Sequence, residues 1–556
     1  MVHGRRRFLG HAAAAALTGC AHRRARPQAS GSAELVVKGG TILTGDRARP
    51  SVHAIAIAKG TVLAVGDERD ASAWIGESTK VVDLAGGTAT PGLCDAHAHL
   101  VGLGRSLAIV DLRGATSIDE VVARLKQGAP ASGWVLGRSW DQNLWPDRAM
   151  PTAAPLTAAF PDRPVWLRRI DGHAGWGNAA LLAAAKIDAT TTAPAGGEIL
   201  RDAAGQPTGV LVDAAMGLVP VPDVTHDELR TAIIDGQRHA LARGLTGVHE
   251  MGIGPTEDAL YRELAGAGEL RMRVVAYAAE DWLQRDLDTR TPDAITPAAR
   301  YLLRGVKLYA DGALGSRGAA LLGDYADRHG HRGLMQHSIA ELDALTRKCV
   351  AGNWQIATHA IGDAANRAVL DSYARALAGA PARDRRLRIE HCQIVAAEDI
   401  PRFARLGVIA SMQPTHATSD MPWVPDRIGT AGLPGAYAWR RFLDAKVVLA
   451  FGSDFPVEKV EPTLGLYAAI TRQDLDGKPD GGWLPDQRLS LAEAVHAFTQ
   501  AAAWACHREG HLGRLAPGQR ADVTCFAGPL DERAPRTIAD LAVRATIVDG
   551  EIVHEA

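Results

Sequence analysis

Eight short apolar segments, separated by longer amphipathic stretches rich in alanine and leucine, constrain the fold of this chain more than any other feature. Short buried runs that alternate with helical patterns are typical of a parallel sheet built from βα units. Eight such units favour a closed (β/α)₈ TIM barrel over a doubly wound sheet, so the predicted fold class is α/β. The predicted strands are residues 91–99, 246–252, 271–277, 305–312, 355–363, 387–393, 408–414 and 447–454.

The two ends of the chain have a different pattern. Residues 33–90 and 513–556 are rich in glycine and β-branched residues and alternate like short antiparallel strands. Neither segment alone buries enough surface, so we expect the two to pair into one small β-sandwich domain. Residues 91–512 would form the barrel, and the gap at about 103–243 is too long for one βα loop, which predicts an inserted subdomain after strand one.

Residues 1–32 are predicted to precede the fold. MVHGRRRFLGHAAAAALTGC has a basic start, an alanine-rich run and a small-residue site before Cys20, which is typical of an export signal and too short for a spanning helix. The arginines at 5–6 resemble a twin-arginine signal, and LTGC at 17–20 resembles a lipobox. We expect an exported, periplasmic protein whose membrane contact is a lipid anchor at Cys20. The alternative is a basic N-terminus on a cytoplasmic enzyme.

Charge and cysteine usage narrow the function classes. The formal net charge of −2 gives no argument for nucleic-acid or anionic-membrane binding. Apart from Cys20, five cysteines are scattered without a CxxC pair, which argues against a disulfide framework and a cysteine zinc site. A small molecule is the expected partner, and the sequence leaves an oligomer open.

Polar residues at the ends of the predicted strands form the main functional signal. In a barrel of this type the chemistry lies at the C-terminal ends of the strands. Several imidazoles with one carboxylate there indicate a Zn²⁺ site of nitrogen and oxygen ligands. Taken singly, each has a plain structural explanation, such as a core histidine or a turn cap; their joint order is harder to explain that way. The residues are His97 and His99 on one face of strand one, Lys307 in strand four, His359 in strand five, His391 in strand six and Asp454 closing strand eight.

Lys307 is the least expected of these residues, because it lies in the middle of an apolar strand. Lysine is almost never fully buried without a partner, and an unpaired buried ammonium tends to lose its proton. Its position therefore predicts a partner, or a chemical change, at the barrel mouth.

The order of these residues resembles that of the amidohydrolase superfamily. The motifs GVKLYADGALGSRG, ATHAIGDAAN, RIEHCQ, QPTHATSDMPW and AFGSDFPVE are similar to the branch that contains N-substituted formamide deformylases. In that branch a large insertion follows strand one, matching 103–243, and GRSWDQNLW and RRIDGHAGWGN lie inside it.

The resemblance implies a binuclear centre of divalent ions, with zinc as the default. A metal-bound water of pKa about 7 would attack the substrate, and Asp454 would accept its proton and pass it to the leaving nitrogen. An unmodified lysine beside a single ion remains the alternative to a carboxylated Lys307. The implied ligands are His97 and His99 with Asp454 for one ion, His359 and His391 for the other, and N6-carboxylated Lys307 as the bridge.

The predicted activity is metal-dependent hydrolysis of a non-peptide C–N bond in an amide, N-acyl or formamide-type substrate. An esterase, lactonase or phosphotriesterase would use the same centre. A deaminase is disfavoured, because the chain has HAIGD where a catalytic glutamate would follow the strand-five histidine. A surface lipoprotein that binds metal without turnover is the alternative outside enzymes.

Two parts of the insertion are candidate contacts with the substrate. His173, in DGHAGWGN, is predicted to contact a carbonyl or oxyanion, or else to cap its glycine-rich loop. Trp140 and Trp145 would wall the pocket, unless they are simply buried.

Two further candidates lie in loops of the barrel. Arg317 would bind a substrate carboxylate or a neighbouring aspartate such as Asp311. Asp420 would determine specificity or anchor its loop. Glu250, at the end of strand two, receives no role.

Overall fold

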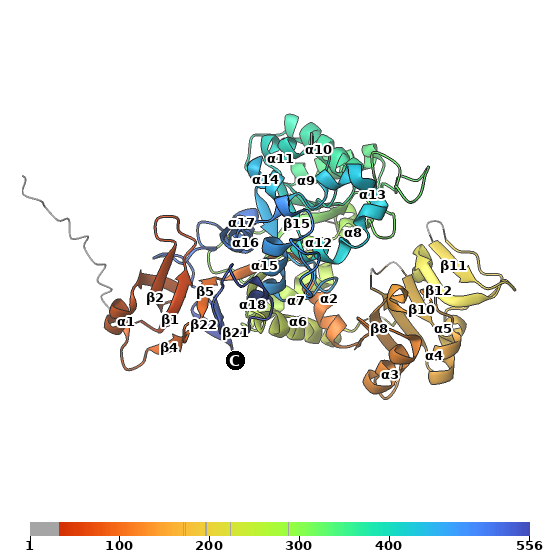
Figure 1. The fold of residues 1–556 in the computed structure, drawn as a ribbon, viewed down its shortest axis with the longest axis horizontal. Coiled ribbons are helices and arrows are strands. Elements are labelled where there is room, and N and C mark those ends of the chain that lie inside the picture. The colour runs from red at the N-terminus through yellow and green to blue at the C-terminus, as the bar shows by residue number, and fades with distance from the viewer. Residues whose placement is uncertain (1–32, 171, 173, 195–196, 223, 287–288) are drawn as a thin grey trace, which may run out of the picture.

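The computed structural model describes residues 33–170, 172, 174–194, 197–222, 224–286 and 289–556. Its centre is a sheet of eight parallel strands, which confirms the predicted TIM barrel (Figure 1). Each strand overlaps one predicted segment, because each segment is an apolar run bounded by turn residues, although the bounds differ by several residues, as for β15 (301–309 against the predicted 305–312). In sheet order the strands are β6 (Leu93–Ala98), β13 (Leu245–Ile253), β14 (Arg273–Ala278), β15 (Tyr301–Tyr309), β16 (Gln355–Ala360), β17 (Arg388–His391), β18 (Ile409–Met412) and β19 (Leu449–Phe451).

The first and last strands meet where the chain leaves β19. The Asp454 amide donates to the His97 carbonyl at 2.8 Å, and the His99 amide donates to the Phe455 carbonyl at 2.9 Å. These two backbone bonds close the barrel at its C-terminal end. They also place the two histidines of the HxH motif beside Asp454.

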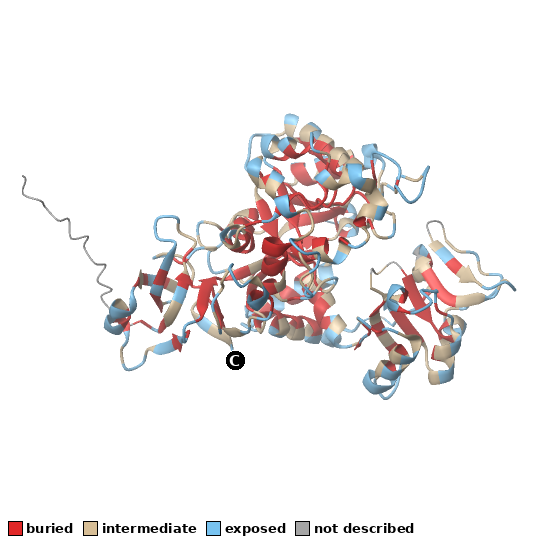
Figure 2. Ribbon diagram, in the orientation of Figure 1, coloured by how far each residue is buried: buried red, intermediate tan, exposed pale blue. Residues whose placement is uncertain are grey.

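Helices cover the outside of the barrel and bury its strands (Figure 2). Several begin at capping boxes that are visible in the sequence, such as Thr225 with Glu228 and Ser338 with Glu341. The helices are α2 (Leu100–Leu107), α6 (His226–Leu241), α7 (Pro255–Gly266), α8 (Glu280–Arg285), α9 (Ile339–Ala351), α10 (Asp363–Ala378), α11 (Ile400–Leu406), α12 (Pro414–Asp420), α13 (Val424–Gly432), α14 (Trp439–Asp444), α15 (Pro462–Thr471), α16 (Leu491–Phe498) and α17 (Gln500–Ala505).

Strands from both ends of the chain join in one second sheet. β5 pairs antiparallel with β20, and apolar side chains from strands of both chain ends pack into one cluster, which forms the expected small β-sandwich. In sheet order the strands are β22 (Glu551–Glu555), β21 (Val543–Val548), β20 (Val523–Phe526), β5 (Thr88–Pro91), β1 (Leu35–Leu43), β2 (Ser51–Ala58) and β3 (Thr61–Gly66), with β4 (Lys80–Asp83) beside β1 and the helices α1 (Glu68–Trp74) and α18 (Pro535–Ala539).

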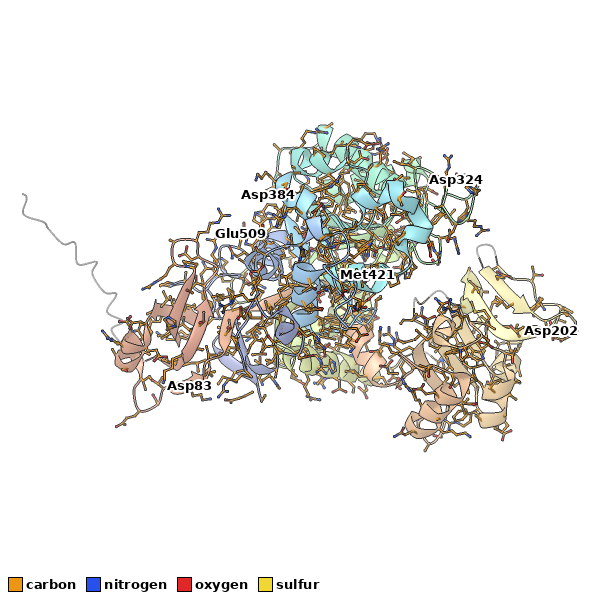
Figure 3. The ribbon with its side chains drawn as sticks, viewed as in Figure 1. Asp83, Asp202, Asp324, Asp384, Met421 and Glu509 are labelled. Atoms are coloured by element: carbon orange, nitrogen blue, oxygen red, sulfur yellow. The ribbon has the colours of Figure 1, made fainter. Side chains whose placement is uncertain are left out.

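A third, mixed sheet lies between α2 and α6 in the chain and has its own apolar core. Figure 3 shows Asp202, in its outer hairpin, at the opposite end of the molecule from Asp83 of the β-sandwich. Its elements are β7 (Val110–Asp111), α3 (Ile118–Gly128), β8 (Val135–Trp140), α4 (Ala154–Ala159), β9 (Val165–Arg169), β10 (Ala174–Gly177), α5 (Ala179–Ala184), β11 (Gly197–Arg201) and β12 (Pro207–Asp213).

Both connections of this inserted sheet return to the barrel at one place, because α2 and α6 pack against each other. The contact is close: a Cβ added at Gly104 would lie 1.7 Å from the Ala232 carbonyl oxygen. The ends of the predicted 103–243 insertion therefore contain parts of two helices that pack beside the barrel.

Two predictions fall on residues that the structure does not describe. The export signal at 1–32 and His173 lie outside the described residues. Within the part of the chain that is described, the helices are all too short or too polar to cross a bilayer.

Candidate metal centre

The predicted ligands come together at the C-terminal end of the barrel. One donor atom each of His97, His391 and Asp454 lies within 4.8 Å of the others. Asp454 Oδ1 is 3.2 Å from His99 Nε2 and 3.4 Å from His97 Nε2. The ring of His359 lies 4.6 Å from that of His391, centroid to centroid. The close cluster of His97, His391 and Asp454 spans the two sets of ligands expected from the sequence.

Two of these residues have an unusual backbone. His391 has φ 75° and Asp454 has φ 62°, both in the left-handed region that residues other than glycine rarely adopt. Both lie where a strand ends, so the turn directs their side chains to the barrel mouth. Such strain, about 1–3 kcal/mol per residue, persists only where the surrounding structure enforces it, and it is concentrated at functional sites.

Three of the histidines are held through the same ring nitrogen. Nδ1 of His97 lies 2.6 Å from Glu390 Oε2, Nδ1 of His99 lies 3.0 Å from the Met251 carbonyl, and Nδ1 of His391 lies 2.9 Å from Gln413 Oε1. Each partner is an acceptor, so in the neutral imidazole the proton sits on Nδ1 and Nε2 keeps a lone pair. A histidine oriented in this way by a carboxylate or carbonyl is the usual arrangement of a metal ligand.

Burial keeps most of these rings neutral. It lowers the pKa of His97 to about 4 and of His359 to about 3, and it places that of His391 well below the usual value. Burial alone would raise the pKa of Asp454, but the surrounding histidines, His97 foremost, lower it well below its usual value. The carboxylate is therefore ionised while most of its neighbours carry lone pairs.

The donor set fits a cation. Asp454 Oδ1 is buried and has no hydrogen-bond partner among the described residues. Two imidazole lone pairs face this oxygen at 3.2 and 3.4 Å, and acceptors that face each other in a buried site need a positive charge between them. Asp454 also raises the pKa of His99 against the effect of burial, so a proton competes with a metal ion at that nitrogen.

Lys307, in β15, is the expected bridge and is 1% exposed. Among the described residues, no hydrogen bond or ion pair to its ammonium group is found, and its Nζ lies 5.0 Å from the centre of the Tyr309 ring. Burial lowers its pKa to about 8, although Glu390 and Asp454 act in the opposite direction. An appreciable share of the side chain is then a neutral amine near pH 7.5.

A buried charged layer below the site was missed by the sequence reading. Arg388 donates to both oxygens of Glu390, at 2.8 and 2.9 Å, and the other face of Glu390 holds His97. Arg388 also donates to His249 Nδ1 at 2.7 Å. The signal was present in RIEH, since two charged residues at i and i+2 in an apolar strand share its inner face.

Two more residues at the mouth received no role from the sequence. Asp95 accepts from the His97 amide and from the amide and hydroxyl of Ser453, which ties β6 to the loop that carries Asp454. His416, in QPTHATSD, packs its ring 6.0 Å from that of His391, and its Nε2 lies 3.8 Å from Asp454 Oδ2. The histidine of the QPTHATSD motif was the signal in the sequence that could have identified His416.

For Trp140 and Trp145 the sequence left two explanations open, a pocket wall and simple burial, and the structure favours burial. Both are buried in the core of the inserted sheet, where they pack against Trp176. Their indole N–H groups donate to the carbonyls of Leu167 and Ala115, at 2.8 and 3.2 Å. With both polar atoms satisfied inside the insertion, the structural explanation applies to each.

The remaining loop candidates have protein partners. Arg317 forms an ion pair with Asp327 at 2.8 Å, and Asp311 instead accepts the backbone amides of 320, 361 and 362. Asp420 accepts from the Tyr437 hydroxyl at 2.5 Å, as a loop anchor would. Glu250 accepts from the first amides of α2 and so fixes the start of the helix that follows His99.

The barrel and its ligand set define the class of (β/α)₈-barrel hydrolases that depend on divalent metal ions. This chain belongs to the amidohydrolase family, whose model matches residues 80–554. The resemblance seen in the sequence motifs is thereby confirmed.

Relatives support this assignment over nearly the whole chain. The putative amidohydrolase YtcJ of Bacillus subtilis (strain 168) is 32% identical over 93% of this chain and 98% of its own. The N-substituted formamide deformylase of Arthrobacter pascens is 27% identical over 94% of this chain and 98% of its own. An uncharacterized metal-dependent hydrolase of Pyrococcus horikoshii OT3 has a similar structure, with TM-score 0.73, 29% identity, and coverage of 88% and 96% of the two chains.

Proposed function

We propose that this hydrolase cleaves a non-peptide C–N bond in an amide, N-acyl or formamide-type substrate. The observation that supports a metal-dependent hydrolase most directly is the buried Asp454 carboxylate, which faces the Nε2 atoms of His97 and His99 and has no hydrogen-bond partner at Oδ1 among the described residues. The similarity to the N-substituted formamide deformylase of Arthrobacter pascens points to the same bond type.

The residues at the mouth would hold two divalent ions, His97 and His99 with Asp454 on one side and His359 and His391 on the other. Zinc is proposed because it prefers nitrogen and oxygen ligands of these types. When bound, the ions supply Lewis acidity toward a carbonyl and lower the pKa of water to about 7.

Lys307 is proposed to carry a carboxyl group on Nζ. The neutral amine attacks CO₂, an N–C bond forms, and one proton leaves to solvent, so that a buried amine becomes an anion. The absence of a partner at Nζ among the described residues and the lowered pKa of about 8 support this, because both favour the reactive amine. An anion at this position would be compatible with neighbouring cations, whereas an ammonium group would not.

Asp454 is proposed to move the proton during turnover. Its carboxylate accepts a proton from the attacking water and delivers it to the departing nitrogen, so that a carboxylate and an amine are released. The carboxyl is ionised at rest because neighbouring histidines lower its pKa, as a general base requires. Glu390 and Gln413 hold His97 and His391 in place through their Nδ1 atoms.

A hydrolysis screen with metal analysis of the same preparation tests the proposal. The substrates would be formamides, N-acyl amino acids, cyclic amides, aryl esters and a phosphotriester. We expect turnover of C–N substrates to exceed that of the esters, with metal bound in proportion to activity. Preferred turnover of an aryl ester or of the phosphotriester would move the assignment to an ester or phosphotriester bond. Full activity in protein depleted of metal would contradict the metal-dependent mechanism.

The location of the protein is a separate proposal, which rests on residues 1–32 of the sequence alone. We propose export through the twin-arginine-like signal and lipid attachment at Cys20. Mass spectrometry of the mature N-terminus should find a cleaved chain that begins at a lipidated Cys20. A chain with intact Met1 in the exported fraction would contradict both steps.

A further inference from the structure

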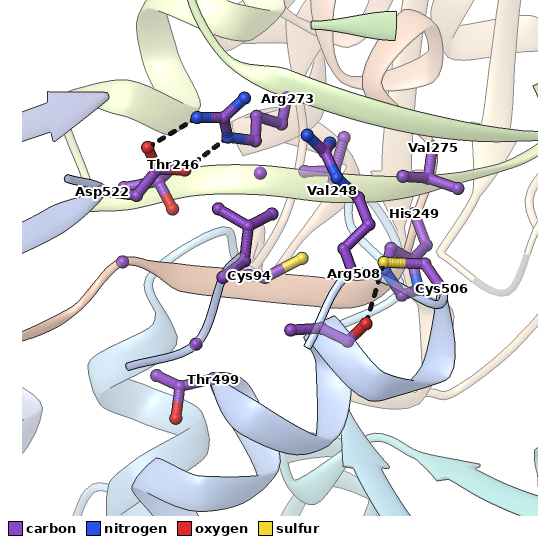
Figure 4. A pocket seen from close by; sticks show the side chains of 15 residues that line it. Cys94, Thr246, Val248, His249, Arg273, Val275, Thr499, Cys506, Arg508 and Asp522 are labelled. Carbon is purple, nitrogen blue, oxygen red and sulfur yellow. Dashed lines mark hydrogen bonds and ion pairs between the residues drawn. The ribbon is translucent and has the colours of Figure 1, made fainter. Parts of the chain in front are cut away.

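A second set of buried polar atoms lies at the opposite, N-terminal end of the barrel. A cavity with an accessible volume of about 30 Å³ is lined there by the first residues of β6, β13 and β14 and by the chain that follows α17 (Figure 4). Its polar lining includes Arg508, His249 and two cysteines, Cys94 and Cys506. None of these residues was given a role in the reaction.

Arg508 is a buried cation that forms no ion pair with a carboxylate among the described residues. It is 1% exposed, and its Nη2 donates to the carbonyls of Thr296 and Pro297. Its Nε and Nη1 are buried, and neither has a hydrogen-bond partner among the described residues. A buried guanidinium is ordinarily paired with an anion, because an unpaired charge is strongly unfavourable in a protein interior.

His249 adds a further donor to the same cavity. Arg388 has only N–H donors, so the 2.7 Å contact of its Nη1 with His249 Nδ1 makes that nitrogen an acceptor. Burial lowers the pKa of His249 well below its usual value, so the ring is neutral and its proton must sit on Nε2. Nε2 is also buried without a partner among the described residues.

Two side chains of the cavity lining that could carry a negative charge, Asp522 and Cys506, already have partners. Asp522 accepts from Arg273 at 2.5 and 2.9 Å and from the Asp549 amide. The Cys506 thiol donates to the Ala503 carbonyl, and burial raises its pKa, so it adds no negative charge.

The charges around the cavity have a positive excess. Asp549 forms ion pairs with Arg273, Arg300 and Arg520, and Asp522 pairs with Arg273 as well, so two carboxylates are shared by three guanidinium groups. Arg508 adds to this excess. With donors in surplus and acceptors consumed, the missing component is an anion.

We propose that this cavity binds one small inorganic anion, chloride in the first instance, between Arg508 and His249. The accessible volume has room for a small particle such as a halide ion and is too small for an anion of the size of gluconate. The anion would join the chain after α17 to β13 beneath the Arg388 layer, and so would stabilise the folded protein. Water alone in the cavity is the competing occupant.

The test compares thermal stability in chloride and in gluconate, an anion too large for the cavity, at constant ionic strength with metal-loaded full-length protein. We expect a saturable rise of Tm with chloride, on the order of 1–3 °C. Arg508→Met should abolish the rise. Arg300→Met, which removes a neighbouring arginine that does not line the cavity, should retain it. Equal Tm curves in chloride and gluconate for the unmodified protein would overturn the proposal.

Anomalous diffraction from unmodified protein crystallised in bromide tests whether an anion occupies the cavity. It needs no variant, so it applies even if Arg508→Met fails to fold. The expected result is an anomalous peak within hydrogen-bond distance of Arg508 Nε or Nη1 and of His249 Nε2. Density for water without an anomalous signal at that position would overturn the proposal.

Discussion

The two ends of the barrel make opposite use of buried polar atoms that lack protein partners. At the C-terminal mouth the atoms without a hydrogen-bond partner among the described residues include an acceptor, Asp454 Oδ1, which faces the Nε2 atoms of His97 and His99. At the N-terminal end they are donors, on Arg508 and His249. Between them Arg388 and Glu390 pair with each other, and each also bonds a histidine, His249 for Arg388 and His97 for Glu390. Buried acceptors without a partner favour a bound cation, and buried donors without a partner favour a bound anion.

The largest expected effect comes from removing the negative charge at the mouth. Asp454→Asn replaces the carboxylate by an amide that neither balances a cation nor accepts a proton as a base. We expect kcat/KM to fall by about 10³-fold or more, together with a loss of bound metal. Activity on the best substrate and metal content per chain are the measurements.

The matched control for this substitution is Asp426→Asn, on the exposed side of α13. It makes the same chemical change away from the cluster, and kcat/KM should stay within about twofold of the unmodified enzyme. If Asp454→Asn kept its metal and its activity, the acceptor-rich mouth would not be a cation site, and the comparison between the barrel ends would fail.

Removal of the Lys307 side chain should have the next largest effect. Lys307→Ala deletes the proposed bridging anion, and we expect activity to fall by about 10²–10³-fold. Short carboxylic acids such as acetate or propionate should restore part of it, because they supply a carboxylate in the vacated space. An active, metal-replete Lys307→Ala protein would show that the residue is a structural lysine.

A more modest loss is expected one step below the mouth. Glu390→Gln keeps the shape of the side chain but removes the carboxylate that fixes the proton of His97 on Nδ1. Metal affinity, measured by competition with a chelator, should weaken by about 10–100-fold. Glu532→Gln, an exposed residue near the C-terminal end, is the matched control and should leave metal affinity unchanged.

Since the buried charge of Arg388 also loses its partner in Glu390→Gln, stability must be measured separately. Thermal unfolding with saturating metal gives the structural cost, and the chelator competition gives the effect on His97. A fall in stability with unchanged metal affinity would show that Glu390 serves only as the partner of Arg388. The Arg388–Glu390 pair would then have no effect on metal binding at the barrel mouth.

The barrel could be predicted from sequence because its strands are apolar runs and its functional side chains lie at strand ends. His97 and Asp454 were placed by that rule, whereas Lys307 stood out as a charged residue inside an apolar strand. The pairing of His97 with Glu390 could not be predicted, because it joins residues 293 positions apart and depends on which strands face each other across the barrel. The Arg508 cavity was hidden for the same reason, since its lining comes from distant segments.

The tryptophans show the other limit of sequence reading, because composition does not distinguish a pocket wall from a core. The hydrogen bonds of the tryptophans do distinguish the two. The indole N–H of Trp145 donates to the Ala115 carbonyl at 3.2 Å, which indicates a core residue rather than a residue of the substrate pocket. Trp145→Phe should therefore cost about 1 kcal/mol of stability, from the lost hydrogen bond and the smaller ring, and change KM less than about twofold. Denaturant unfolding and steady-state kinetics on one preparation separate the two effects. A KM raised about tenfold at unchanged stability would show that Trp145 contacts the substrate. A satisfied indole N–H would then not be enough to identify a core tryptophan in this molecule.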